Sequence, residues 1–289
     1  MKLKVNKESL LQVLQKVQSV VSPRATLPIL SNVLLQAADG KLTVTATDLE
    51  LSVQTRTDAE IEKEGATTLP SRRIFSIVRE IPSAEVEIEV DDKNVASITS
   101  GSSRFKLNGM SDEEFPPLPK LDGGNQYSLE QPVFREMLQK TSYAASTDET
   151  RYILNGVLMS FAEDKLTMVA TDGRRLALID QELEYPKEAE KDLVLPTKTV
   201  NELVRTLEDE GALKIRAVEN QIAFDFGEML VISKLIDGTY PNYRQVIPSG
   251  SDVRIAIKRQ GMLAAVRRAA LLTTEQSTSV RLNCSKNML

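Results

Sequence analysis

Five segments of the chain carry apolar residues at the spacing of an amphipathic helix. In the first of them, Leu10, Leu14 and Val17 recur at intervals of three or four residues and so share one helix face. Ser71 and Thr197 each follow a Leu-Pro pair at the start of such a segment and are expected to act as N-caps. The predicted helices cover residues 7–17, 71–80, 131–141, 197–206 and 258–271.

Shorter segments between these helices alternate apolar and polar residues with a period of two. Leu42, Val44 and Ala46 are expected on one face of a strand, and the threonines between them on the other. The segment 86–90 alternates valine or isoleucine with glutamate in the same way. Asp-Gly pairs, which are typical of hairpin turns, occur at 39–40, 172–173 and 237–238. Strands and helices together predict an α+β fold.

The same order of segments occurs twice along the chain. Residues 28–51 match residues 152–176, and Lys41-Leu42-Thr43 aligns with Lys165-Leu166-Thr167 at an offset of 124 residues. The two Leu-Pro pairs that precede predicted helices match at an offset of 126 residues. We therefore expect repeated domains, each made of two β-α-β-β-β halves with its helices on one face of antiparallel sheets.

A third copy begins near the end of the sequence. Residues 262–269 resemble 10–17 and 134–141, and Val280-Arg281-Leu282 is predicted to be the strand that follows. The predicted domains are 1–120, 128–246 and an incomplete third domain at 250–289, about one third of the repeat length. We expect either a truncated form or a sequence that continues beyond residue 289.

The composition excludes several kinds of chemistry. The sequence has no His and a single Cys, Cys284, which excludes His-based nucleophile systems, Cys-cluster metal sites and intrachain disulfides. It contains no phosphate-binding glycine loop and no nucleophile-elbow motif. We therefore expect no catalytic residue, no metal site and no cofactor. The sequence shows neither a secretory signal nor an apolar run that could span a membrane, and the lone Cys suits a reducing cytoplasm.

The basic residues are concentrated in the predicted helices. These segments hold 13 Lys or Arg residues and four Glu, whereas the remainder holds 23 basic and 37 acidic residues. A positive helical face is the electrostatic signature of binding to a phosphate backbone. Surface helices that merely favour Lys and Arg are the alternative, but Glu is an equally good helix former and is scarce here. The low content of aromatic residues, 4%, disfavours base stacking, so we expect backbone contact without base readout.

Several long segments resemble the bacterial sliding clamp family, the beta subunits of DNA polymerase III. The matching text is ATLPILSNVLLQ (25–36), GATTLPSRRIFSIVREIP (65–82), SSRFKL (102–107), RYILNGVL (151–158), MVATDGRRLAL (168–178) and SKLIDGTYPNYRQVIP (233–248). The resemblance implies three similar domains per chain and a ring of two chains, joined head to tail, with helices inside around duplex DNA. It implies a non-catalytic processivity factor that tethers the polymerase to DNA.

The resemblance also implies a cleft for a short peptide carried by partner proteins. The positions that match this cleft are Leu154, Thr171, Gly173, Arg174, Arg175, Leu176, Pro241, Val246 and Val266. The apolar members would hold a leucine or phenylalanine anchor. Without the resemblance, core packing explains Leu154 and Leu176 equally well, and a hairpin turn explains Asp172-Gly173. Arg174 stands where many members of the family carry His.

DNA and subunit contacts follow partly from the resemblance and partly from charge. The resemblance points to Arg24, Arg151 and Tyr152 as DNA contacts. Charge and repeat position add the helical residues Arg72, Arg73, Arg79, Lys140, Lys198 and Arg205. Arg72 or Arg73 could instead serve the subunit contact of a homodimer, where Phe105 and Leu107 are also expected.

The implied partners are duplex DNA, the DNA polymerase III alpha subunit, the clamp loader and other proteins with a clamp-binding motif. The expected location is the cytoplasm, in association with the nucleoid. Two other classes remain as hypotheses: an enzyme that uses carboxylates between the repeats, and a protein-binding repeat module without a role on DNA. The missing catalytic motifs disfavour the first, and the basic helices have no explanation under the second.

Overall fold

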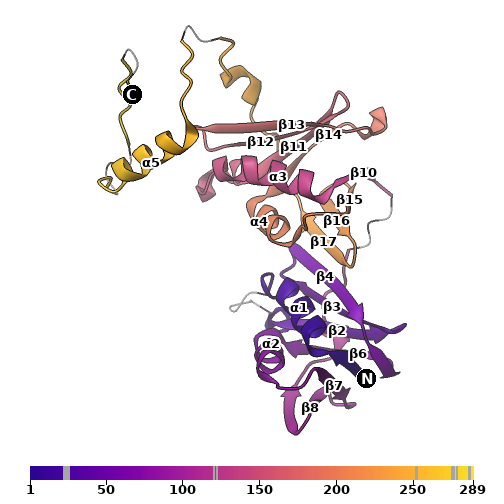
Figure 1. Cartoon of the computed structure of the whole chain (residues 1–289). Helices are drawn as coiled ribbons and strands as arrows, with labels where there is room; N and C mark the ends of the chain where they lie inside the picture. The colour runs from indigo at the N-terminus through magenta and orange to yellow at the C-terminus, as the bar shows by residue number, and fades with distance from the viewer. Residues whose placement is uncertain are drawn as a thin grey trace. The chain divides into compact units, whose positions relative to one another are not determined.

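The computed structural model describes residues 1–21, 27–119, 121, 123–250, 253–274, 277, 279–285 and 288–289. The chain divides into two compact units, Met1–Tyr240 and Pro241–Leu289. The first unit contains two repeats of the same architecture (Figure 1).

Each repeat is built from two halves in which a strand and a helix precede three strands. The first repeat contains β1 (Lys2–Asn6), α1 (Lys7–Gln18), β2 (Asn32–Ala38), β3 (Lys41–Thr47), β4 (Leu51–Asp58), β5 (Glu60–Lys63), β6 (Gly65–Pro70), α2 (Ser71–Glu80), β7 (Glu85–Val90), β8 (Val95–Ser100) and β9 (Ser103–Asn108). The second contains β10 (Asn125–Glu130), α3 (Gln131–Thr141), β11 (Gly156–Ala162), β12 (Lys165–Thr171), β13 (Leu176–Glu182), β14 (Lys191–Pro196), α4 (Thr197–Thr206), β15 (Ala212–Ala217), β16 (Gln221–Phe226) and β17 (Met229–Lys234). The predicted β-α-β-β-β halves are therefore confirmed.

The halves of a repeat exchange their first strands. In the first repeat, β6 joins the sheet of β2, β3 and β4, while β1 joins β7, β8 and β9. In the second repeat, β14 pairs with β11, and β10 pairs with β15. Because each half contributes a strand to the sheet of the other, neither half can fold into a complete sheet alone.

One antiparallel strand pair joins the two repeats. β17 of the second repeat pairs with β4 of the first from Met229↔Thr55 to Ser233↔Leu51. The result is one continuous sheet of order β10-β15-β16-β17-β4-β3-β2-β6. At the centre of this junction Val231 lies opposite Val53, and both side chains are fully buried. The pairing satisfies strand edges that would otherwise be exposed.

The core lies between the sheets and the helices, which run along one side of the sheets (Figure 1). The predicted stripe of α1 is confirmed, since Leu10, Leu14 and Val17 are buried. In β3, Leu42, Val44 and Ala46 are fully buried as the alternation predicts. The helices also begin and end within two residues of their predicted bounds.

The expected N-caps at Ser71 and Thr197 are wrong. The residues before α2 and α4 are Pro70 and Pro196, and neither helix start has a side-chain cap. Ser71 is the first helical residue and is buried, and the Thr197 hydroxyl donates to the carbonyl oxygen of Asn155. The strand runs through the proline directly into the helix, so these residues lie one position inside the helix and face other partners.

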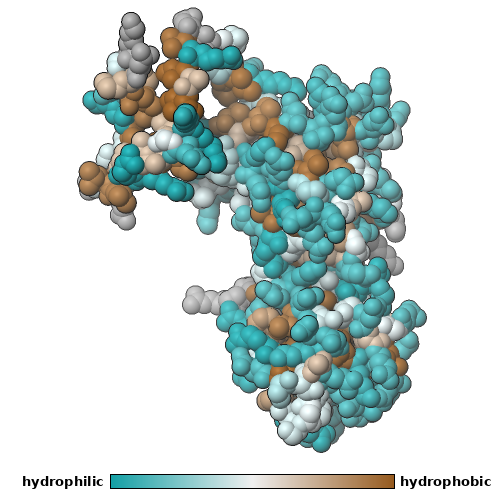
Figure 2. All heavy atoms as spheres, viewed as in Figure 1, coloured by the Kyte–Doolittle hydropathy of each residue, from teal (hydrophilic) through white to brown (hydrophobic). Residues whose placement is uncertain are grey.

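The second unit contains η6 (Tyr243–Val246), a 3-10 helix, and α5 (Arg259–Ala270). No residue of α5 is buried, and the unit carries exposed apolar side chains, including Val253 and Leu272. Figure 2 shows hydrophobic side chains gathered on the surface of this segment. The strand predicted at Val280–Leu282 is wrong: these residues lie in neither helix nor strand, because no strand of the described residues pairs with them.

Candidate DNA-binding and peptide-binding sites

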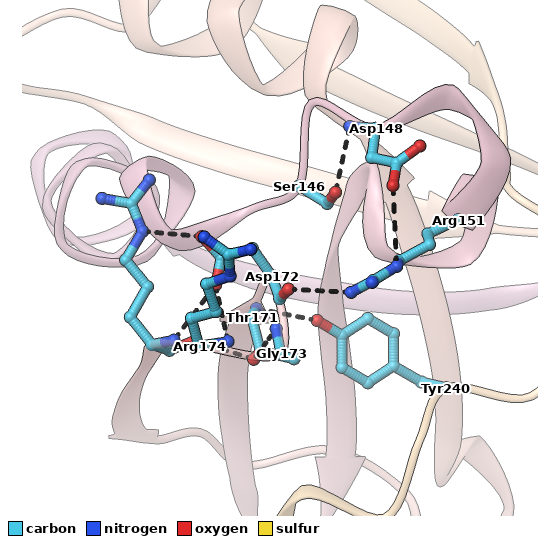
Figure 3. Close-up of polar contacts among 9 residues, drawn as sticks. Ser146, Asp148, Arg151, Thr171, Asp172, Gly173, Arg174 and Tyr240 are labelled. Atoms are coloured by element: carbon cyan, nitrogen blue, oxygen red, sulfur yellow. Dashed lines mark hydrogen bonds and ion pairs between the residues drawn. The ribbon is translucent and has the colours of Figure 1, made fainter. Parts of the chain in front are cut away.

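The turn that joins β12 to β13 is held by its own side chains (Figure 3). The Thr171 hydroxyl accepts a hydrogen bond from the Gly173 N–H at 3.1 Å and donates to the Arg175 carbonyl oxygen at 2.7 Å. The Asp172 carboxylate accepts from the N–H groups of Arg174 and Arg175 at 2.9 and 3.0 Å. Gly173 has φ of 83°, a left-handed conformation that favours glycine.

Two residues from other segments fix the position of this turn. The Arg151 guanidinium, in the 3-10 helix η4 (Glu149–Leu154), donates to the Asp172 carbonyl oxygen at 3.3 Å and lies 3.6 Å from the Asp148 carboxylate. The Tyr240 hydroxyl accepts from the Thr171 N–H at 3.1 Å. Figure 3 shows Arg151 and Tyr240 reaching the turn from separate segments.

The electrostatics of the turn follow from these contacts. The N–H groups of Arg174 and Arg175 donate to Asp172 and hold the pKa of its carboxyl below the usual value. Hydrogen bonds from Thr150 lower the pKa of Asp148 in the same way. Burial raises the pKa of the Tyr240 phenol to about 12. The carboxylates are therefore ionised and the phenol neutral near neutral pH, so the group has no residue poised for proton transfer.

The residues predicted to bind a peptide fall in both units. Thr171, Gly173, Arg174, Arg175 and Leu176 lie together in the turn of the first unit. Leu154 is buried in the same unit, as core packing requires, whereas Leu176 is half-buried. Pro241, Val246 and Val266 belong to the second unit; Val246 is 70% exposed and Val266 is half-buried.

The two arginines of the turn extend into solvent. Arg175 forms an ion pair with Asp172 at 3.1 Å, and its guanidinium lies 5.9 Å from the ring centroid of Tyr143. Tyr143 is 60% exposed, so an accessible aromatic ring lies beside the Arg175 guanidinium. Arg174 and Arg175 directly precede the half-buried Leu176 in the chain. Such a combination can hold an apolar anchor flanked by acidic groups.

Four of the predicted DNA-binding residues project from helix surfaces. Arg72 and Arg73 are exposed in the first turn of α2. Arg79, in the last turn of α2, forms an ion pair with Glu80, and Lys140 on α3 forms one with Glu136. Exposed pairs of this kind contribute little to stability, so the cations remain able to exchange partners.

Two other predicted DNA-binding residues contact the opposite repeat. Lys198 on α4 forms an ion pair with Asp48 of the first repeat, and burial lowers the pKa of its amine. Arg205 on α4 donates to carbonyl oxygens at the end of α1.

The remaining predicted DNA-binding residues lie in η4 or outside the described residues. Tyr152 is 60% exposed and follows Arg151 in the chain. Arg24 lies outside the described residues.

The expected subunit contact lies on a strand at the edge of a sheet. β9 carries Phe105, 38% exposed, and Leu107, which is buried. The β8–β9 and β16–β17 hairpins have the same pairing, Ser100↔Ser103 and Phe226↔Met229, so Phe105 occupies the position of Val231. Val231 is fully buried by the junction with β4, whereas Phe105 lacks such cover.

The structure adds residues that the sequence pattern did not single out. Tyr240 and Asp148 support the turn, and Tyr143 borders it. Only Tyr240 had a signal in the sequence, because Tyr240-Pro241 matches Phe115-Pro116 of the first repeat. Among the described residues, no cluster of His, Cys, Asp and Glu could hold a metal ion, and no helix is long and apolar enough to cross a membrane.

Comparison with known proteins places these features in one family. Family models of the DNA polymerase III beta subunit match the chain, the N-terminal domain at residues 1–119 and the central domain at 128–242. The beta sliding clamp of Chlamydia trachomatis is 35% identical over 289 residues, covering 100% of this chain and 70% of that protein. The beta sliding clamp of Escherichia coli K12 is 35% identical and covers 100% of this chain and 79% of that protein.

Solved structures agree with this assignment. The DNA polymerase sliding clamp of Bacillus subtilis superimposes with a TM-score of 0.92 at 33% identity, over 95% of this chain and 75% of that chain. The sliding clamp of Bartonella birtlesii, solved bound to griselimycin, gives a TM-score of 0.92 at 36% identity, over 96% of this chain and 76% of that chain. The chain therefore belongs to the bacterial beta sliding clamp family, the beta subunits of DNA polymerase III.

Proposed function

We propose that this chain is a non-catalytic processivity factor that encircles duplex DNA and tethers the replicative polymerase. The observation that carries the proposal is the β17–β4 junction between repeats. It is a head-to-tail contact, since different strands of the two repeats meet, and such contacts close into rings when the rotation between units allows it. A tether of this kind raises the effective concentration of polymerase at its substrate.

The proposed DNA contacts are Arg24, Arg72, Arg73, Arg79, Lys140, Arg151 and Tyr152. Of these, Arg72, Arg73, Arg79 and Lys140 are exposed cations on helices. Lysine and arginine point charges without a cluster of base-reading groups support contact with the phosphate backbone in any sequence. Lys198 and Arg205 are omitted from this set, because both are bound to groups of the first repeat.

The proposed protein partners are the polymerase alpha subunit, the clamp loader and other proteins with a clamp-binding peptide. The half-buried Leu176, together with Arg174, Arg175 and Thr171, supports docking of a peptide with an apolar anchor. Leu154, Gly173, Pro241, Val246 and Val266 complete the proposed set.

We further propose that β9, with Phe105 and Leu107, forms the subunit contact of a homodimer. The proposed domains are 1–120, 128–246 and a third that begins at 250–289, and the proposed ring contains two chains. Location in the cytoplasm, in association with the nucleoid, follows from the proposed role on chromosomal DNA.

The test of encirclement is retention on nicked circular duplex DNA after loading. A closed ring should stay on the circle at high salt and leave once the circle is linearised, whereas direct contacts weaken with salt because counterions are released. Tight, sequence-selective binding to a short linear duplex would refute the tether.

A further inference from the structure

Arg205 and Glu202 on α4 contact the end of α1 in the other repeat. The Arg205 guanidinium donates to the Lys16 carbonyl oxygen at 2.7 Å and to the Ser19 hydroxyl at 2.7 Å. The Ser19 hydroxyl donates to one Glu202 oxygen at 2.7 Å, and Arg205 lies 2.5 Å from the other. The contacts of Ser19 and Lys16 with α4 join residues 183 to 189 positions apart in the chain.

The chemistry of a helix end explains why an arginine stands here. The last carbonyl oxygens of a helix lack partners within the helix and carry a partial negative charge. The Arg205 guanidinium donates hydrogen bonds to the carbonyl oxygens of Gln15 and Lys16, which lie in the last turn of α1. The second repeat therefore provides the C-terminal cation for a helix of the first repeat.

The burial of Glu202 makes this contact more demanding than a surface ion pair. The Glu202 side chain is 5% exposed, while that of Arg205 is 40% exposed. A buried carboxylate that loses its partner is strongly destabilised, whereas an exposed pair contributes little. The contact is therefore sensitive to the relative position of the two helices, since a small rotation would remove the Ser19 donor from Glu202 and the α1 carbonyl oxygens from Arg205.

Two further polar contacts lie at the two ends of the β17–β4 strand pair. Glu228, in the β16–β17 turn, accepts from Lys41 at 3.0 Å and from Arg56, and both donors belong to the first repeat. At the other end, Lys198 pairs with Asp48. Strand pairing alone leaves the twist between the two repeats free to vary. In the helix layer, Arg205 and Glu202 contact the end of α1, and Lys16 on α1 lies 3.4 Å from the Glu208 carboxylate.

We propose that Glu202, Arg205 and Ser19 form a clasp that sets the angle between the first and second repeats. Arg205 is then a positioning residue for ring closure, and it does not bind DNA. The inference rests on the proposed ring, because closure of a ring requires a fixed rotation at each junction.

The test measures the distance between the repeats and the affinity for DNA in the same variants. Spin labels are attached to Ser76→Cys on α2 and Gln139→Cys on α3, both exposed, in a Cys284→Ser background. The variants are Arg205→Met, Arg205→Lys and Arg79→Met. Arg79 is the matched control, since it occupies the same position of α2 and pairs only with Glu80 among the described carboxylates.

The clasp predicts a narrow distance distribution in the parent chain and a broader or shifted one in Arg205→Met. Arg205→Lys should lie between them, and Arg79→Met should match the parent. In the same set, Arg79→Met should weaken binding to a short duplex at low salt, while Arg205→Met should not. Circular dichroism confirms that each variant is folded.

An unchanged distance distribution in folded Arg205→Met would overturn the clasp. If that variant also lost duplex affinity, as is expected of Arg79→Met, Arg205 would be a DNA contact after all. If no arginine variant altered duplex affinity, the proposed DNA contacts would be wrong. The distance measurement would still show whether Arg205 fixes the angle between the repeats.

Discussion

The same turn occurs in both repeats, but its surroundings differ. In the first repeat, Asp48 accepts from the N–H groups of Glu50 and Leu51, and Thr47 accepts from the Leu49 N–H. Asp172 and Thr171 make the matching bonds in the second repeat, 124 positions later. The backbone conformation is also the same, with φ of 76° at Leu49 and 83° at Gly173.

The two turns differ in the groups that contact them. The first turn lies against the second repeat: Lys198 pairs with Asp48, and the Lys234 N–H donates to the Glu50 carbonyl oxygen at 2.8 Å. The second turn exposes Arg174 and Arg175 and leaves Leu176 half-buried. One hydrogen-bonded motif thus serves as a covered junction in the first repeat and as an open surface in the second.

The largest expected effect tests the open surface. Leu176→Asp should reduce affinity for a leucine-containing clamp-binding peptide by about 100-fold, because a carboxylate in an apolar site costs several kcal/mol. Leu49→Asp, at the exposed tip of the first turn, is the control and should leave peptide affinity unchanged. Fluorescence anisotropy with a labelled peptide measures both. Equal affinities in folded Leu176→Asp and parent protein would remove this site.

The second prediction compares how much the aspartate of each turn contributes to the free energy of unfolding. Asp48→Ala removes two hydrogen bonds and leaves Lys198 without its partner, so we expect a loss of about 2–3 kcal/mol in the free energy of unfolding. Asp172→Ala removes the same bonds from an open turn and should cost about 1 kcal/mol. Urea unfolding compares the two. A larger loss in Asp172→Ala would contradict the covered role of the first turn.

Peptide affinity at the open turn should depend on pH only in the acidic range. The pKa of Asp172 is lowered from its ordinary value of 3.8, so the stabilisation of the turn by its carboxylate is fully present above that value. This stabilisation is lost as pH falls through the lower pKa of the folded state. Peptide affinity should therefore be constant from about pH 7 to pH 5 and decline only below about pH 4. Asp172→Asn, which cannot ionise, should flatten this decline. A loss of affinity centred near pH 6 would point to another group.

Local sequence pattern was enough to predict the helices and strands of the two repeats, whereas the strand predicted at Val280–Leu282 is wrong because no described strand pairs with it. The stripe of α1 and the alternation in β3 are examples, and the repeat revealed that the halves share one topology. The β17–β4 junction was not predictable, since nothing local to Val53 specifies Val231 as its partner. For the same reason Lys198 and Arg205 were assigned to DNA by charge and repeat position, without their partners in the first repeat.

The candidate site was predicted to a lesser degree than the fold. Thr171, Gly173 and Leu176 came from resemblance, and the structure places them in one turn. The support from Arg151 and Tyr240 depends on segments that meet only in three dimensions. A pattern in the sequence can identify the turn, but the contacts that hold it are tertiary.

The smallest expected effects come from substituting the residue of each turn that has a positive φ, Leu49 in the first turn and Gly173 in the second. Gly173→Ala places a Cβ 3.3 Å from the Arg151 guanidinium at φ of 83°, and we expect a loss of about 1 kcal/mol. Leu49→Gly should act in the opposite sense. A left-handed leucine costs about 1–2 kcal/mol, while glycine costs about 0.5–1 kcal/mol in chain entropy, so a gain of a few tenths remains. Thermal unfolding of both variants checks the signs. If Leu49→Gly were instead clearly destabilising, the 44%-exposed leucine would be making a contact that holds the first turn against the second repeat, and the covered junction would depend on its side chain as well as on Asp48.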